Sequence, residues 1–220
     1  MQTIKETKKI MNKLQTALAQ CKIVPVVVVN EIAHAAPLAH ALQNGGLTVV
    51  EVTLRTPAAL AVISAMRQAC PEMAIGAGTI LNAQNIIDAR NAGAEFGVSP
   101  GTSPALLQAI LDSGWNFIPG CATPSEAIAL AEAGFKVVKL FPAEVVGGLA
   151  MLKSLASPLP HIQFMPTGGV RLDKVAEYIA QPNVAALGGT WIAPADKLAA
   201  GDFAGIEALA REAYLASQMA

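Results

Sequence analysis

One lysine of this chain occupies a position that lysine rarely takes. Lys139 lies within the run Phe135-Lys-Val-Val-Lys-Leu-Phe-Pro142, in the apolar half of a predicted β-strand. Burying an unpaired ammonium ion is unfavourable, so burial favours the neutral amine, which can attack a carbonyl carbon and form a Schiff base. Lys139 is therefore a candidate for covalent catalysis. The alternative is a lysine that reaches solvent from the strand end, as Lys136, on the opposite face, is predicted to do.

A second set of polar residues follows an earlier apolar run. The segment Val50-Glu51-Val-Thr53-Leu-Arg55-Thr56 alternates polar and apolar side chains. Because successive side chains of a strand point to opposite faces, Glu51, Thr53 and Arg55 are predicted to share one face. An acid, a hydroxyl and a base on one inward face are unusual and indicate a functional site. A structural ion pair between Glu51 and Arg55 is the alternative interpretation.

Two glycine pairs follow the last two predicted strands. One lies in Pro166-Thr167-Gly168-Gly169 and the other in Gly188-Gly189-Thr190-Trp191. Glycine lets backbone N–H groups approach an anion closely, and a neighbouring threonine hydroxyl adds a donor. The pattern predicts a phosphate site. The alternative is that the glycines only form turns.

These residues need a scaffold that brings the ends of several strands together. Apolar runs centred near residues 26, 50, 75, 97, 117, 138, 164 and 186 alternate with amphipathic segments at 31–44, 57–69, 82–92, 103–113, 124–133, 145–156, 171–180 and 196–216. Eight such units predict a single α/β domain over residues 1–220, a (β/α)8 TIM barrel with residues 1–20 as an extra N-terminal helix packed on it. Active sites of such barrels lie at the C-terminal strand ends, where the polar motifs fall. A doubly wound open sheet is the alternative.

Several predicted helices begin with recognisable signals. Thr56-Pro57, Ser103-Pro104 and Thr123-Pro124 each place a hydroxyl before a proline that can open a helix. Glu144 is predicted to open the helix at 145–156, where a carboxylate suits the helix dipole. Trp191 is predicted to pack against the protein rather than to stack on a ligand.

The composition argues against several classes of function. A net charge of -1 gives no reason to expect nucleic acid or an anionic membrane as partner, and Pro, Gly and amide residues interrupt both long uncharged stretches, so no membrane span is predicted. Three distant cysteines without a CxxC motif indicate reduced thiols in a cytoplasmic protein. His34, His40 and His161 lack the spacing of metal ligands, so neither a metal nor a cofactor is expected.

Six motifs occur in the order seen in one enzyme family. From about Lys22 to Glu212 the chain resembles the class I 2-keto-3-deoxy-6-phosphogluconate (KDPG) aldolases, also called 4-hydroxy-2-oxoglutarate (KHG) aldolases. The motifs that carry the resemblance are Glu51-Val-Thr-Leu-Arg-Thr56, Gly76-Ala-Gly-Thr79, Val98-Ser-Pro-Gly101, Lys139-Leu-Phe-Pro-Ala-Glu144, Pro166-Thr-Gly-Gly169 and Gly188-Gly-Thr-Trp191.

The resemblance implies a cytoplasmic, homotrimeric (β/α)8 lyase of the Entner–Doudoroff pathway that acts on a 2-keto-3-deoxy sugar acid phosphate. It implies Lys139 as the Schiff-base lysine and Glu51 as the general acid and base. Arg55 and Thr79 would hold the pyruvyl carboxylate. Phe141, on the same face as Lys139, is expected to contact the substrate. The distal phosphate would be bound by Thr167, Gly168, Gly169, Gly189 and Thr190.

Two other functions stay open on the sequence. A phosphate-binding barrel isomerase or epimerase would use Glu51 as a base and would form no covalent adduct. A sugar-phosphate binding protein would bind a ligand without turnover. A nearer alternative is an aldolase of the same chemistry that acts mainly on 4-hydroxy-2-oxoglutarate or on the galactonate phosphate.

Overall fold

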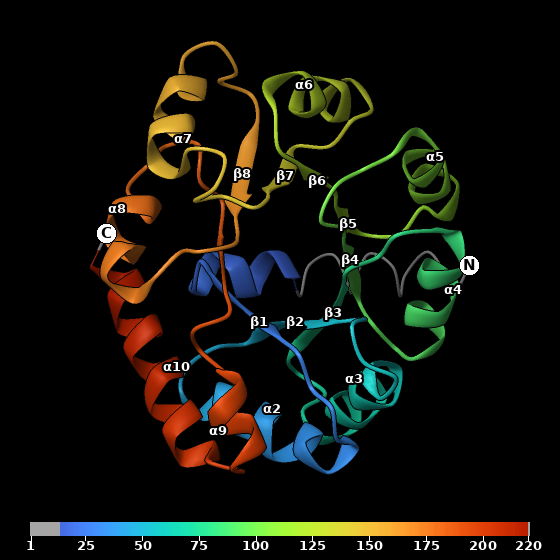
Figure 1. Cartoon of the computed structure of the whole chain (residues 1–220), viewed down its shortest axis with the longest axis vertical. Coiled ribbons are helices and arrows are strands. Elements are labelled where there is room, and N and C mark those ends of the chain that lie inside the picture. The colour runs from blue at the N-terminus through green and yellow to red at the C-terminus, as the bar shows by residue number, and fades with distance from the viewer. Residues whose placement is uncertain (1–13, 220) are drawn as a thin grey trace.

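The computed structural model describes residues 14–219, which form an α/β fold with a strongly curled parallel sheet inside a ring of helices (Figure 1). Six strands pair in the order β5-β4-β3-β2-β1-β9 and three in the order β6-β7-β8. The strands are β1 (Ile23–Val27), β2 (Val49–Thr53), β3 (Ala74–Gly78), β4 (Phe96–Val98), β5 (Phe117–Ile118), β6 (Gly120–Cys121), β7 (Val137–Leu140), β8 (Gln163–Pro166) and β9 (Leu187–Gly189). The predicted apolar runs fall on or beside these strands.

One predicted strand, centred on Phe117, is divided into β5 and β6 by Pro119. Proline has no N–H to donate to a neighbouring strand, so the ladder is interrupted there. The Pro119 carbonyl still accepts a hydrogen bond of 2.8 Å from the Lys139 amide. On the other side of the molecule, parallel bridges join Phe164 to Val184 and Thr167 to Gly188.

The helices alternate with the strands along the chain, as the periodicity predicts. They are η1 (Ile32–His34), α2 (Ala35–Asn44), α3 (Ala59–Ala69), α4 (Ala83–Asn91), α5 (Pro104–Ser113), α6 (Pro124–Glu132), α7 (Gly148–Ala156), η2 (Leu172–Lys174), α8 (Val175–Ile179), α9 (Ala195–Ala199) and α10 (Phe203–Gln218). Within the described part of the chain, no helix is long and apolar enough to cross a membrane.

The predicted start signals hold for two of these helices. Ser103 and Thr123 accept hydrogen bonds from the amides of the third helical residues of α5 and α6, and each precedes a proline. The prediction for Thr56 is wrong, because its hydroxyl donates to the Val29 carbonyl at 2.6 Å and α3 begins only at Ala59. The prediction for Glu144 is also wrong, because α7 begins four residues later, at Gly148.

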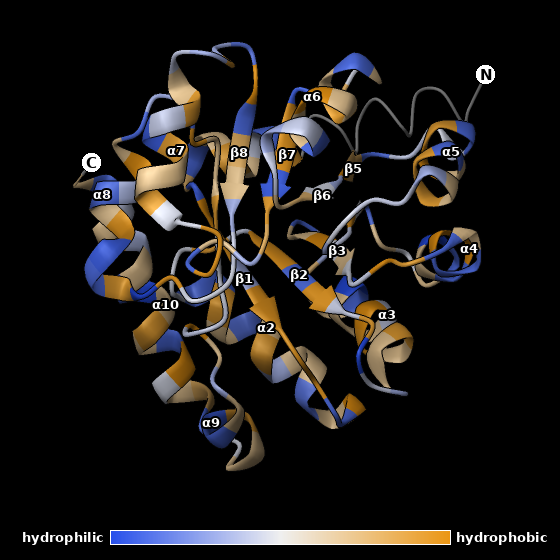
Figure 2. Ribbon diagram, turned by 45° about the horizontal axis from the view of Figure 1, so that its top comes forward, coloured by the Kyte–Doolittle hydropathy of each residue, from blue (hydrophilic) through white to orange (hydrophobic). Residues whose placement is uncertain are grey.

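Two apolar clusters follow from the alternation of side chains along each strand. The outer cluster lies between the strands and helices α2 to α10, and the apolar residues concentrate along the strands in Figure 2. The inner cluster includes Val24, Val49 and Phe96, near the starts of β1, β2 and β4, and Met165, which is opposite Lys139 in the register of β7 and β8. Ala17, in the helical residues 14–20, packs on this inner cluster. The predicted N-terminal helix is therefore present over 14–20, and its first thirteen residues lie outside the described part.

Candidate functional site

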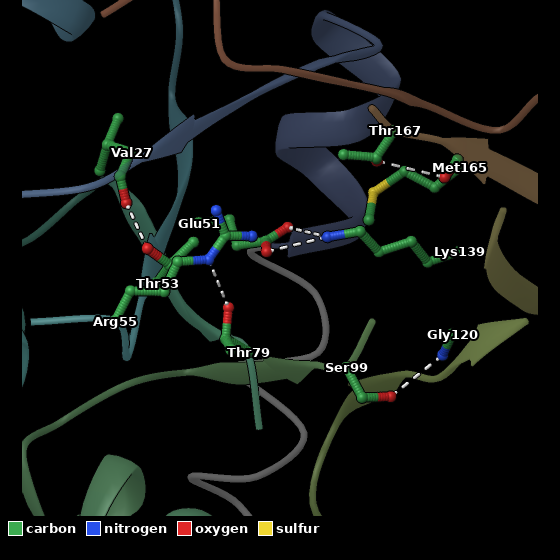
Figure 3. A network of polar contacts seen from close by, with 10 residues as sticks. All are labelled: Val27, Glu51, Thr53, Arg55, Thr79, Ser99, Gly120, Lys139, Met165 and Thr167. Carbon is green, nitrogen blue, oxygen red and sulfur yellow. Dashed lines mark hydrogen bonds and ion pairs between the residues drawn. The ribbon is translucent and has the colours of Figure 1, made fainter. Parts of the chain in front are cut away.

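Lys139 and Glu51 meet inside the curled sheet (Figure 3). Lys139 is the third residue of β7 and Glu51 the third of β2. The Lys139 Nζ lies 3.0 Å from Glu51 Oε1 and 3.1 Å from Oε2. Both side chains are almost fully buried, with 5% and 1% of their surfaces exposed. Two residues 88 positions apart are thus brought into direct contact by the folding of the sheet.

This contact explains how a lysine can be buried in an apolar strand. An unpaired buried ammonium ion is very unfavourable, whereas a carboxylate at hydrogen-bond distance offsets much of that penalty. The same geometry lets a proton pass between the amine and the carboxylate without any intervening group. Lys136, by contrast, is exposed, as the sequence predicts.

The Glu51 carboxylate lies next to Gly78 on the neighbouring strand β3. A Cβ atom at Gly78 would come within 2.1 Å of Glu51 Oε1, closer than an unbonded carbon and oxygen can approach. Gly78 is opposite Thr53 in the register of β2 and β3. No sequence motif predicts this role of Gly78, although the two-residue period of Gly76-Ala-Gly78 places both glycines on the inward face.

Arg55 and Thr79 lie together just beyond the ends of β2 and β3. Arg55 Nε donates to Thr79 Oγ1 at 3.2 Å, and Arg55 itself is exposed. Thr79 has a backbone φ of 60°, in the left-handed region that β-branched residues avoid. Since Glu51 pairs with Lys139 and Arg55 with Thr79, the structure does not support the alternative of a simple Glu51–Arg55 ion pair. Thr53, the third predicted residue of this face, donates instead to the Val27 carbonyl at 3.0 Å.

The two glycine pairs differ in conformation. Gly168 and Gly169 have positive φ angles of 100° and 82°, which glycine adopts readily. Gly189 ends β9 and is therefore not in a turn, and a Cβ there would lie 2.1 Å from the Trp191 ring. Trp191 thus packs on the strand, as predicted.

The two pairs lie on adjoining segments. The bridge between Thr167 and Gly188 joins them, and a Cβ at Gly188 would lie 2.1 Å from Thr167 Oγ1. Thr167 is buried, with its hydroxyl 3.4 Å from the Met165 carbonyl, whereas Thr190 is exposed. The residues predicted for a distal anion are therefore gathered at one rim, next to the Lys139 strand.

Phe141 and Ser99 complete the surroundings of Lys139. The centre of the Phe141 ring is 5.5 Å from Lys139 Nζ. Ser99 is fully buried, and its Oγ accepts a 3.0 Å hydrogen bond from the Gly120 amide, next to Lys139 in the strand register. Ser99 belongs to the motif Val98-Ser-Pro-Gly101, but its position beside Lys139 is not predicted from the sequence.

A thiol is a poor alternative nucleophile here. Cys121 lies on β6 beside β7, and burial, with a further contribution from Glu126, raises the pKa of its thiol to about 12. Such a thiol stays protonated at neutral pH and reacts slowly. Over residues 14–219, no group of three or more His, Cys, Asp or Glu side chains is arranged to hold a metal ion.

The fold and the site together define a class of protein. A buried amine paired with a carboxylate, near the C-terminal ends of parallel strands, is suited to an enzyme that handles a carbonyl substrate. The family model for KDPG and KHG aldolases matches residues 14–209. The chain therefore belongs to the KDPG and KHG aldolase family, whose named members are carbon–carbon lyases.

Individual relatives agree with the family match. The chain is 44% identical to the 2-dehydro-3-deoxy-phosphogluconate aldolase of Treponema pallidum, covering 89% of this chain and 93% of that protein. It is 43% identical to the KHG/KDPG aldolase of Escherichia coli K12, covering 90% and 93%. The crystal structure of Legionella pneumophila KDPG aldolase, with pyruvate captured as a covalent carbinolamine, superposes with a TM-score of 0.87 at 38% identity and covers 91% of this chain and 97% of that one.

Proposed function

We propose that this protein cleaves 2-dehydro-3-deoxy-6-phosphogluconate (KDPG) to pyruvate and glyceraldehyde 3-phosphate through a Schiff base on Lys139. We also propose that it cleaves 4-hydroxy-2-oxoglutarate to pyruvate and glyoxylate. The single observation that carries the proposal is the buried contact of 3.0 Å between Lys139 Nζ and Glu51 Oε1. The names of the relatives, and the pyruvate carbinolamine in the Legionella enzyme, support the substrate and the covalent route.

Formation of the Schiff base begins with proton transfer from the Lys139 ammonium to Glu51. The neutral amine attacks C2 of the substrate, and the oxygen at C2 takes a proton to give a carbinolamine. Glu51 then protonates the leaving hydroxyl, water departs, and an iminium ion remains between C2 and Lys139. The distance between Lys139 Nζ and the Glu51 oxygens supports these proton transfers, because one carboxylate can both accept the proton from the amine and donate it to the leaving hydroxyl.

Cleavage follows from the electron demand of the iminium ion. Glu51 takes the proton of the C4 hydroxyl, the C3–C4 bond breaks, and its electron pair moves to the C2–nitrogen unit to form an enamine. The aldehyde leaves. Glu51 returns the proton to C3, and water hydrolyses the resulting iminium ion, which releases pyruvate and restores the ammonium on Lys139 and the carboxylate on Glu51.

Other residues hold the two ends of the substrate in this proposal. Arg55 binds the pyruvyl carboxylate with its planar guanidinium, and the Thr79 hydroxyl bonded to Arg55 Nε lies beside it. Phe141 closes the apolar side of the Lys139 amine. The distal phosphate is bound by backbone and hydroxyl groups of Thr167, Gly168, Gly169, Gly189 and Thr190, and the positive φ angles of the first glycine pair support close backbone approach.

We further propose a single, closed (β/α)8 barrel that assembles as a homotrimer in the cytoplasm. Closure is supported by the single residue that separates β5 from β6 and by the bridge between Thr167 and Gly188. The trimer and the compartment rest on the sequence resemblance, and light scattering of the purified protein tests the trimer.

The decisive experiment is trapping with pyruvate and borohydride, followed by mass spectrometry of the digested protein. We expect a stable adduct on Lys139 in the wild type and in the Lys136→Ala control, and none on residue 139 in Lys139→Ala. Normal turnover by Lys139→Ala would end the proposal. An unmodified wild type would instead favour the isomerase or epimerase, which needs no adduct and which the comparisons do not favour.

A further inference from the structure

A tyrosine and a glutamate meet behind the proposed phosphate site. Tyr178, on α8, is completely buried, and its hydroxyl donates a hydrogen bond to Glu144 Oε1. Burial raises the pKa of the Tyr178 phenol, and the hydrogen bond and charge of Glu144 raise it further. The phenol therefore keeps its proton and remains a hydrogen-bond donor at neutral pH. Neither residue takes part in the chemistry proposed for Lys139.

Glu144 is attached to the glycine loop, which we define as residues 167–169. Its amide donates to the Gly168 carbonyl at 3.1 Å, and the preceding Ala143 amide donates to the Thr167 carbonyl at 2.8 Å. The side chain touches the loop as well, because a Cβ at Gly169 would lie 2.8 Å from Glu144 Cβ. Any displacement of Glu144 is therefore transmitted to the backbone of the glycine loop.

The space for this contact is provided by another glycine. Gly148, the first residue of α7, has a positive φ of 51°. A Cβ there would lie 2.8 Å from the Tyr178 hydroxyl and 3.2 Å from Glu144 Oε1. The absence of a side chain at Gly148 thus lets the hydroxyl and the carboxylate meet, and the pair ties α7, α8 and the glycine loop together.

We propose that Glu144 and Tyr178 are positioning residues that hold the glycine loop in the conformation needed to bind the distal phosphate of the substrate. A carboxylate repels a phosphate, so Glu144 cannot itself be the ligand and must act through the loop. Backbone N–H donors bind an anion well only when they are fixed beforehand. This inference rests on the proposed function and predicts a selective effect on phosphorylated substrates.

The variant Tyr178→Phe tests this inference, because it removes one oxygen and keeps the buried ring. We expect the KM for KDPG to rise about fivefold to tenfold, the size of one lost hydrogen bond, with little change in kcat. The KM and kcat for 4-hydroxy-2-oxoglutarate, which has no phosphate, should stay unchanged. Tyr214→Phe, at the other tyrosine of the chain, on α10, is the matched control and should behave as the wild type on both substrates.

Variants of Glu144 separate the hydrogen bond from the charge. Glu144→Gln keeps an oxygen that can accept from Tyr178, so it should leave the KM for KDPG close to that of the wild type. Glu144→Ala should raise the KM for KDPG in the same way as Tyr178→Phe, although Tyr178→Phe also removes a hydrogen bond between the phenol and the Leu149 backbone. The double variant Tyr178→Phe, Glu144→Ala should be no worse than Tyr178→Phe alone, because the contact between the two side chains is already lost in that single variant.

Three results would overturn the inference. They are equal losses on both substrates, effects of the two single variants that multiply in the double variant, and a normal KM for KDPG in Tyr178→Phe. Trapping of pyruvate by each variant shows that it is folded and that the lysine chemistry is intact. A failure of the proposed function would appear in the wild type itself, which would then neither trap pyruvate nor cleave either substrate.

Discussion

The buried charges of Lys139 and Glu51 stabilise each other, and a substitution of either residue removes that stabilisation. Removing one partner leaves the other as an unpaired charge in an apolar interior, which is far less favourable than the pair itself. Glu51 has only 1% of its side chain exposed, so water cannot replace a lost partner easily. A useful test of its role must therefore keep the shape and remove only the capacity to accept a proton.

Glu51→Gln meets this condition. The amide keeps the size of the carboxylate and can still accept a hydrogen bond from Lys139, but it cannot carry a proton at neutral pH. We expect kcat to fall about 10²–10⁴-fold, the usual contribution of general acid–base catalysis, while pyruvate still binds. Steady-state kinetics and pyruvate titration measure the two effects. A kcat within the wild-type range would remove Glu51 from the mechanism.

Thr79 combines an unfavourable backbone conformation with a hydroxyl bonded to Arg55. Replacing it with glycine or with alanine removes the hydroxyl in both cases, but only glycine adopts a φ of 60° without strain. We expect Thr79→Gly to be more stable than Thr79→Ala by about 1 kcal/mol in urea unfolding. Both should raise the KM for the keto acid alike. Equal stability of the two variants would indicate that the conformation carries no strain.

At the scale of elements, the pairing of β2 with β3 shapes the candidate site as much as Lys139 and Glu51 do. The register sets Thr53 opposite Gly78, and the missing side chain of Gly78 leaves the room that the Glu51 carboxylate occupies. Gly78→Ala should displace that carboxylate from Lys139 and lower kcat by about 10²-fold, since small shifts of reacting groups have effects of this size.

The control for this prediction is Gly101→Ala. A Cβ at Gly101 meets nothing within 4 Å, so the added methyl group should be tolerated and kcat should be retained. Circular dichroism establishes that both variants are folded before their kinetics are compared. If Gly78→Ala kept full activity in the folded state, the space beside Glu51 would not limit catalysis.

Local patterns predicted those parts of the fold that depend on neighbours in sequence. The two-residue period predicted that Lys139 and Glu51 point to the inside of the sheet, where the structure has them in contact. The hydroxyl–proline pairs at Ser103 and Thr123 correctly predicted two helix starts. The prediction failed where a distant group decides the outcome. Thr56 bonds to the Val29 carbonyl 27 residues away instead of opening α3. Glu144 is held by Tyr178, 34 residues away, and no sequence pattern links those two positions.

At the scale of the whole molecule, the two ends of the curled sheet carry different kinds of residue. Lys139, Glu51 and the glycine loop lie toward the C-terminal ends of the strands. The inner cluster members Val24, Val49 and Phe96 lie near the strand starts, and Ala17 of the helix 14–20 belongs to the same cluster. The residues proposed to bind and react and the apolar residues near the strand starts thus lie at different levels of the curled sheet. Substitutions at the starting end should change stability without changing the chemistry.

The pair Ala17→Asp and Ala19→Asp tests this separation. Ala17 is 4% exposed, whereas Ala19, two residues further along the same helix, is exposed. A buried, unpaired carboxylate is strongly unfavourable, so Ala17→Asp should lose more than about 2 kcal/mol of unfolding free energy, while Ala19→Asp should stay close to the wild type. In the folded fraction of both variants, pyruvate trapping on Lys139 and kcat should be unchanged. A lower kcat in folded Ala17→Asp, measured against the titrated concentration of Schiff-base sites, would mean that the helix 14–20 helps to shape the opposite end of the sheet.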